Sequence, residues 1–226
     1  MRAPDGAFTD ARLRTPKAAG IAGIVFAILI TAIFWLLRSA VPADPLEAGA
    51  WLTSEPGKAA LAVNLIPFAG VAFLWFIGVV RDRFGGLEDR FFATVFLGSA
   101  LLFLAMLFVS AAILGALILI ASSAATNELV SSATFRFARA VAYVVMNAYA
   151  LKMAGVIMIS ASTVIIYTRI APRWIAVTGY VLALLLWVGS YFLGWSIVMF
   201  SAWVFLVSAY ILVDNLRHES EKSAEE

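Results

Sequence analysis

Five long apolar runs constrain the fold of this chain more than any other feature of its sequence. They cover residues 18–37, 59–80, 91–127, 140–168 and 174–213. A helix needs about 20 apolar residues to cross the hydrocarbon of a bilayer. In lipid, only helices and closed barrels satisfy all their own backbone hydrogen bonds. The runs therefore predict an all-α fold, a polytopic transmembrane helix bundle.

The third and fifth runs, of 37 and 40 residues, are each long enough for one long helix or two short ones. The fifth run contains an aromatic and glycine cluster at 191–195 that suits an interfacial turn, whereas the third has no comparable break, since Gly115 is flanked by Leu114 and Ala116. We therefore expect six spans, although a helix followed by a re-entrant segment is an open alternative for 91–127. The predicted spans are 18–37, 59–80, 91–121, 140–168, 174–191 and 195–213, between an N-terminal segment, 1–17, and a tail, 214–226.

Six spans place both termini on the same side of the membrane, and the basic residues indicate which side this is. Eleven of them share the side of the termini, namely Arg2, Arg12, Arg14, Lys17, Arg81, Arg83, Arg90, Arg169, Arg173, Arg217 and Lys222. The other side has four, namely Arg38, Lys58, Arg136 and Arg139. Because cytoplasmic loops are enriched in Lys and Arg, this asymmetry predicts cytoplasmic termini. The first run is longer than the apolar core of a signal peptide, so we expect a permanent span there.

Several classes of site and partner are disfavoured by composition. The chain has no cysteine, which excludes disulfides, thiolate nucleophiles and cysteine-ligated clusters. Its one histidine, His218, lies in the polar tail, away from any membrane-embedded metal or haem site. A net charge of +2 is too small to indicate nucleic acid binding. We therefore expect no cofactor, no metal, no nucleic acid partner and no enzymatic activity. A serine–lysine dyad would have to combine Lys152 with Ser99, Ser110, Ser160 or Ser162, none of which lies in a recognisable motif.

Lys152 is the only charged residue inside the predicted spans. A charge at bilayer depth costs a few kcal/mol, so it marks a candidate functional site. On a helix, Tyr149, Lys152, Thr163 and Tyr167 share one face, which suggests a ligand-binding stripe in a water-filled cavity. The alternative is a structural lysine that either snorkels towards the interface or pairs with a carbonyl, and that tolerates replacement by methionine. In both cases we expect the amine to contact hydroxyls or carbonyls of other spans.

Asn64 and Pro67 in the second span form another candidate site. Proline removes one backbone hydrogen bond and exposes the carbonyl of Val63, which Asn64 is placed to repair or exploit. Some transporters bind ligands at such broken helices. A kinked helix without a ligand is the alternative. Asn147 lies away from the Lys152 face, and we expect it to form an interhelical hydrogen bond.

Two stretches resemble known membrane proteins. Gly78, Asp82, Arg83 and Gly85 resemble the G-x-x-x-D-R-x-G loop of major facilitator transporters, without the basic residues that follow it there. A tight turn with salt bridges is the alternative. Residues 64–99 and 148–174 together resemble uncharacterised bacterial multi-pass membrane proteins, which implies a bacterial inner (plasma) membrane location and no particular activity.

These features predict a non-enzymatic membrane protein, most simply a small-solute or ion transporter-like protein. The alternative is a non-catalytic subunit or scaffold of a larger membrane complex. The spans contain no Asp or Glu, which argues against proton coupling. Expected partners are membrane lipids, further copies of the chain or other membrane subunits. A polar cavity reaching Lys152 would favour transport, whereas a fully packed bundle would favour the complex.

Overall fold

The computed structural model describes residues 16–42, 44, 49, 51–54, 56–84, 90–122, 130, 132–189 and 194–225. Its helices are α1 (Pro16–Ala40), α2 (Trp51–Ser54), α3 (Pro56–Phe84), α4 (Arg90–Ala121), α6 (Ala133–Val144), the π-helix η2 (Val145–Ala150), α7 (Leu151–Thr168), α8 (Arg173–Gly189) and α9 (Ser196–Glu225). Within these ranges there is no strand, and the predicted all-α fold is confirmed.

Five helical stretches in the described ranges are long and apolar enough to cross a membrane. They are Gly20–Ala40, Pro56–Phe84, Arg90–Ala121, Ala133–Thr168 and Ser196–Arg217. Residues 91–121 of the third apolar run lie in the single helix α4, whose 32 residues extend over about 48 Å. Residues 123–127, on which the alternative of a re-entrant segment depends, lie outside the described residues. The fifth run forms α8 and α9, with a turn at Gly194 and Trp195. Because α8 has only 17 residues, it is shorter than a typical span, and the sixth crossing stays a prediction.

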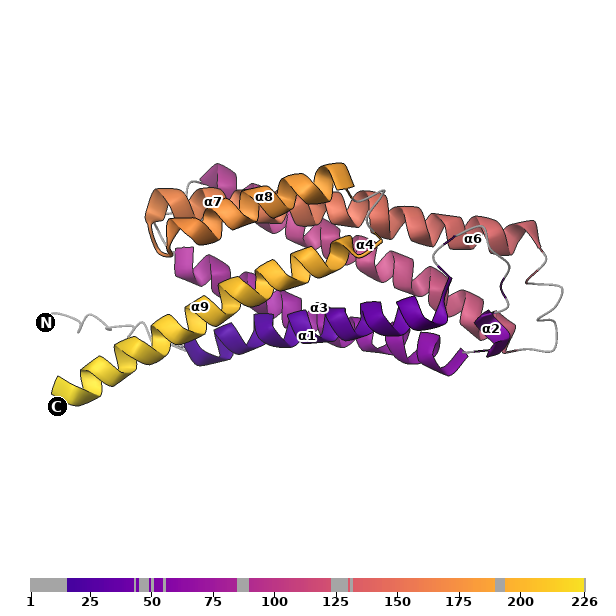
Figure 1. Ribbon diagram of the computed structural model, residues 1–226, viewed down its shortest axis with the longest axis horizontal. Coiled ribbons are helices and arrows are strands. Elements are labelled where there is room, and N and C mark those ends of the chain that lie inside the picture. Colours follow the sequence, from indigo (N-terminus) through magenta and orange to yellow (C-terminus); the bar gives the residue numbers. More distant parts are fainter. Residues whose placement is uncertain are drawn as a thin grey trace, which may run out of the picture.

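The chain runs back and forth along the long axis of the molecule (Figure 1). The first residues of α1 and the last residues of α9 lie at the same end of the bundle. The helices α6, η2 and α7 follow one another without a break in one stretch of 36 residues. The chain then turns after α7, and α8 packs back against it.

Small and hydroxyl-bearing residues bring α1 into close contact with its neighbours α3 and α9. A Cβ added at Gly23 would collide with the Ser208 hydroxyl and lie 2.6 Å from the Phe76 ring. About two helical turns further along, the hydroxyls of Thr31 and Ser201 form a 2.7 Å hydrogen bond between α1 and α9. Close backbone approach and interhelical hydrogen bonds are the main forces that hold helices together in lipid.

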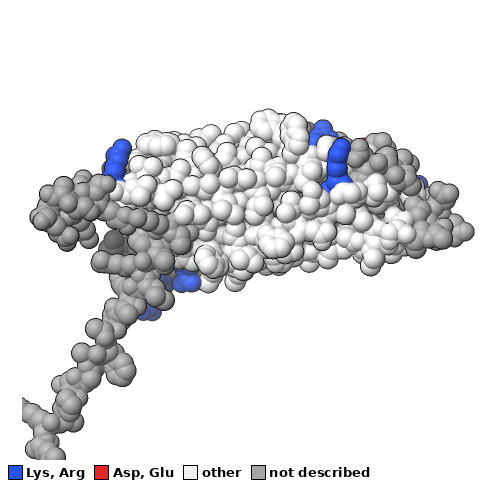
Figure 2. Space-filling view, turned by 90° about the horizontal axis from the view of Figure 1, so that it is seen from below, with Lys and Arg blue, Asp and Glu red and all other residues white. Residues whose placement is uncertain are grey.

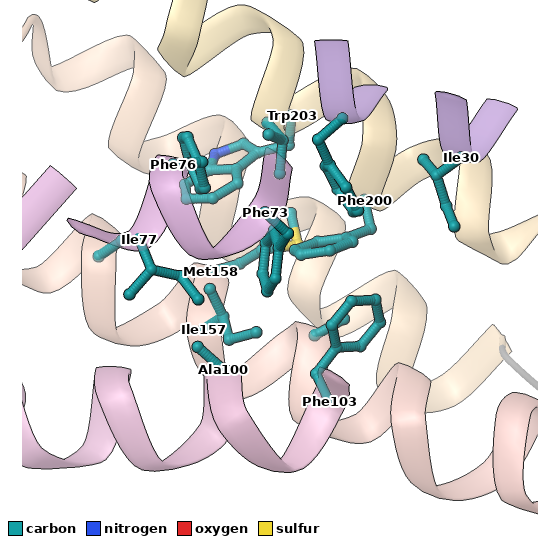
Figure 3. Close-up of a cluster of buried hydrophobic side chains, with 14 of the residues drawn as sticks. Ile30, Phe73, Phe76, Ile77, Ala100, Phe103, Ile157, Met158, Phe200 and Trp203 are labelled. Atoms are coloured by element: carbon teal, nitrogen blue, oxygen red, sulfur yellow. The ribbon is translucent and has the colours of Figure 1, made fainter. Parts of the chain in front are cut away.

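A cluster of phenylalanine rings fills the centre of the bundle (Figure 3). Phe73 of α3 lies 4.6 Å from Phe26, 5.2 Å from Phe103 and 5.8 Å from Phe200, measured between ring centroids. All four rings are fully buried. Edge-to-face pairs of this kind contribute about 0.5–1.5 kcal/mol each beyond their buried area. The cluster therefore joins α1, α3, α4 and α9 in one core.

The outer surface matches a membrane environment. Large apolar side chains such as Trp75, Leu102 and Leu184 are exposed along the sides of the bundle. Figure 2 shows Lys and Arg towards the two ends of the molecule, with an uncharged belt between them on the visible face. This distribution supports the identification of a multi-pass membrane protein.

The stretch that resembles the major facilitator loop is mostly helical. Residues 78–84 form the last turns of α3, so their assignment to a loop was wrong, while Gly85 lies outside the described residues. Arg83 forms a salt bridge with Asp214 of α9 and donates a 2.7 Å hydrogen bond to Asn215. The ion pair thus joins two helices instead of closing a tight turn.

We expect Gly23→Val to destabilise the bundle, because its side chain would force α1 away from Ser208 and Phe76. Overpacking of this kind costs about 1–3 kcal/mol. The measurement is thermal unfolding in mild detergent. Gly98→Val in α4 is the matched control, since a Cβ there meets no atom within 4 Å. Equal unfolding temperatures for the two variants would contradict the close α1–α9 contact.

Candidate functional site

The side chain of Lys152 contacts α8. Its Nζ donates a hydrogen bond to the backbone carbonyl of Trp187, and the Trp187 indole Nε1 donates to the Lys152 carbonyl at 3.2 Å. Gly155, one turn further along α7, makes room for the indole, because a Cβ there would collide with it. Two reciprocal hydrogen bonds therefore join the start of α7 to the end of α8.

The position of Trp187 explains why a lysine suits this place. It is two residues from the end of α8, and the last four carbonyls of a helix have no partner within the helix. A positive charge at a helix C-terminus also interacts favourably with the helix dipole. Lys152 thus caps α8, which agrees with the structural interpretation, and a ligand-binding role stays a prediction.

The predicted polar stripe is not gathered into one site. Thr163 is buried and bonds to the Tyr180 hydroxyl at 2.7 Å and to the Ile159 carbonyl at 2.8 Å. Eleven residues of helix separate it from Lys152, a distance of about 16 Å. Tyr149 and Tyr167 are 58% and 79% exposed on the outer surface. Of the four residues, Lys152 and Thr163 make separate contacts between α7 and α8.

The second predicted site, Asn64 and Pro67, lies on an exposed face of α3. The helix continues through Pro67 from Pro56 to Phe84, without the break that would open a ligand site. Neither residue lines the large cavity described below, although their neighbour Ile66 does. Their predicted role in ligand binding receives no support from this arrangement.

Two of the serines considered as partners of Lys152 bond to backbone carbonyls instead. Ser99 donates to the Phe96 carbonyl and Ser110 to the Ala142 carbonyl, each at 3.0 Å. The Ser162 hydroxyl is buried without a hydrogen-bond partner among the described residues. Among the described residues, the Lys152 amine bonds to the Trp187 carbonyl and to none of these serines, so the geometry does not assemble a serine–lysine dyad.

A cavity of about 440 Å³ lies between α1, α4, η2 and the start of α9. Its volume is within the range of about 300–1,000 Å³ that is typical of small-molecule sites. The inner part is walled by aliphatic side chains, including Ile30, Ile66 and Leu107. Lys152 does not line it. The cavity is located in the half of the bundle away from the described chain ends (Figure 1).

The polar side chains of the cavity come mainly from the outer end of α1 and from α6 and η2. Arg38 is exposed at the end of α1 and lines the rim. Arg139 is only 3% exposed, and its Nη2 donates to the carbonyls of Pro42 at 3.0 Å and Asp44 at 2.7 Å. Arg139 therefore fixes the segment after α1 against α6, beside the cavity.

The π-helix η2 contributes Met146 and Asn147 to the cavity wall. Single π-helical turns within α-helices occur frequently at functional sites. Asn147 donates a 3.0 Å hydrogen bond to the Tyr143 carbonyl one turn earlier, so the expected interhelical bond was wrong. This side chain instead satisfies a carbonyl at the junction with α6.

This cavity was not predicted from the sequence, although the spacing of three of its lining residues indicates it. Arg139, Tyr143 and Asn147 are spaced by four residues and therefore share one helix face. All three line the cavity. The contribution of Arg38 could not be recognised in the same way, because it belongs to a distant helix.

Within the described residues, no group of three or more His, Cys, Asp or Glu is placed to hold a metal ion. No protein-family model and no curated protein matches the sequence, and no solved structure matches the fold.

We expect Lys152→Met to lower the stability of the protein by about 1–3 kcal/mol, because it leaves the Trp187 carbonyl without a partner. The sequence predicted a neutral or slightly stabilising outcome for a structural lysine, and the bond to the Trp187 carbonyl changes that expectation. Thermal unfolding in mild detergent measures the effect. Tyr149→Phe is the control, since Tyr149 is exposed and its hydroxyl makes no hydrogen bond with the described residues. An unchanged unfolding temperature for Lys152→Met would show that the α8 cap contributes no stability.

Proposed function

We propose that this chain is a non-enzymatic, transporter-like protein that binds a small solute in the cavity between α1, α4, η2 and α9. The observation that carries the proposal is the cavity itself, a space of about 440 Å³ with mostly apolar walls and a few polar groups. Binding sites for small molecules have this composition. A bundle that served only as a scaffold would have no need of such a space.

The proposed topology has six spans with both termini in the cytoplasm of a bacterium. It is supported by the back-and-forth path of the chain and by the common end of α1 and α9 (Figure 1). Described arginines at that end are Arg81, Arg83, Arg90, Arg169, Arg173 and Arg217. Under the positive-inside rule this end faces the cytoplasm, and the cavity belongs to the periplasmic half of the membrane.

Reporter fusions test the topology. A reporter that is active only in the cytoplasm should be active after Glu226, and a periplasmic reporter should be active when inserted between Arg38 and Lys58. A periplasmic reporter that is active after Glu226 would rule out the six-span arrangement with cytoplasmic termini.

The cavity is tested with a pair of neighbouring alanines on α4. Ala111 lines the cavity, whereas Ala112 is exposed on the outer surface. Small molecules and lipids that co-purify in mild detergent are identified by mass spectrometry. We expect the wild type and Ala112→Phe to retain the same bound molecule. Ala111→Phe should lose it, because the phenyl ring occupies the space in the cavity where the molecule binds.

Two outcomes would contradict the proposal. If the wild type and Ala111→Phe retain the same molecules, the cavity is not the binding site. If other membrane proteins co-purify in stoichiometric amounts and no small molecule does, the alternative of a non-catalytic subunit of a larger complex is favoured.

A further inference from the structure

The chemistry of the cavity changes along its length. On α1, the lining residues extend from Ile30 to Arg38, eight residues or about 12 Å along the helix. On the facing helix, they extend over the same number of residues from Asn147 back to Arg139. The two arginines are at the same end, so the cavity is cationic at its rim. At its base Asn147, whose amide donates to the Tyr143 carbonyl, lies among mostly aliphatic side chains.

We propose that the ligand of this cavity is an amphiphile with one anionic headgroup and an apolar body. This inference rests on the proposed function and specifies its substrate class. The headgroup lies at Arg38, and the apolar body extends towards Ile30 and Leu107. Carboxylate and phosphate amphiphiles both belong to this class, because a guanidinium group binds either headgroup through paired N–H donors.

The apolar end of the cavity argues for the body of such a ligand. Ile30, Ile33, Ile66 and Leu107 are all buried and come from three different helices, α1, α3 and α4. A small hydrophilic ion would lose its hydration against these walls without gaining hydrogen bonds. An apolar group gains free energy there in proportion to the area that it removes from water.

The rim argues for an anionic headgroup. The Arg38 side chain is exposed and makes no hydrogen bond or ion pair with the residues that the structure describes. No Asp or Glu is found among the described lining residues. Arg139 adds a second guanidinium beside the rim, held by backbone carbonyls. The resulting field attracts anions, and it is stronger near the membrane than in bulk water.

The experiment uses four probes that share a twelve-carbon chain. Dodecanoate and dodecyl phosphate are anionic, dodecyl maltoside is neutral and dodecyltrimethylammonium is cationic. Binding to the full-length protein in phosphatidylcholine nanodiscs is measured by titration calorimetry. Ala111→Phe defines the background of partitioning into lipid. If that variant does not fold, Gly194→Phe replaces it, because a Cβ at Gly194 meets no atom within 4 Å.

We expect saturable binding of at least one anionic probe above this background, and the stronger of the two identifies the headgroup. Arg38→Gln should weaken that binding about threefold to tenfold, and added salt should weaken it as well. Arg136→Gln is the matched control, since Arg136 is an exposed arginine at the same end of the bundle that does not line the cavity.

The proposal is overturned if the neutral or cationic probe binds as tightly as the anionic ones, or if Arg38→Gln and Arg136→Gln behave alike. If all four probes bind to the wild type and Ala111→Phe abolishes their binding, the proposal that the cavity binds small molecules is retained. Only the proposal of an anionic headgroup is then rejected. Absence of saturable binding by every probe also rejects the inference. The co-purification experiment then decides separately whether the cavity binds another class of molecule.

Discussion

In the hydrocarbon of a bilayer, a backbone N–H or C=O group without a partner in the protein has no partner at all. This constraint makes the chain almost entirely helical, and it explains where polar side chains are tolerated. Lys152 donates to a carbonyl at the end of α8, and Asn147 donates to one beside the π-helix η2. Both polar side chains lie where the helical hydrogen-bond pattern is interrupted. Their first role in this fold is therefore to satisfy the backbone.

The second requirement is packing, because lipid tails are as apolar as the helices and provide no hydrophobic drive for association. The bundle meets this requirement with small residues and with rings. Gly23 allows α1 to approach α9, and Gly155 allows an indole to lie against α7. Phe73 and its neighbours fill the space where four helices meet (Figure 3). Where η2 changes the helical phase, packing is incomplete, and the cavity lies beside it.

The most conspicuous residue of the sequence, Lys152, is not part of the proposed binding site. Lys152 is engaged with α8, outside the cavity. Arg38, by contrast, ends an ordinary span and looks like a simple interfacial anchor, yet it lies on the rim of the cavity. Its significance comes from what surrounds it, namely aliphatic walls below and a second arginine, Arg139, on the facing helix. In the proposed binding mode, Arg38 selects an anionic headgroup because the fold places the apolar part of the cavity next to it.

The sequence by itself determined the fold class, because run length and the absence of charge are sufficient to identify membrane-length helices. It also located the turn at Gly194 and showed that the third run lacks a break. It did not determine which polar residues meet. Lys152 and Thr163 share a helix face but have different partners on α8, and Arg38 and Arg139 are 101 residues apart in the chain. Only the tertiary structure decided the contacts of Lys152 and Thr163 and brought Arg38 and Arg139 to the same cavity. These arrangements depend on how separate helices pack, whereas helical periodicity describes one helix at a time.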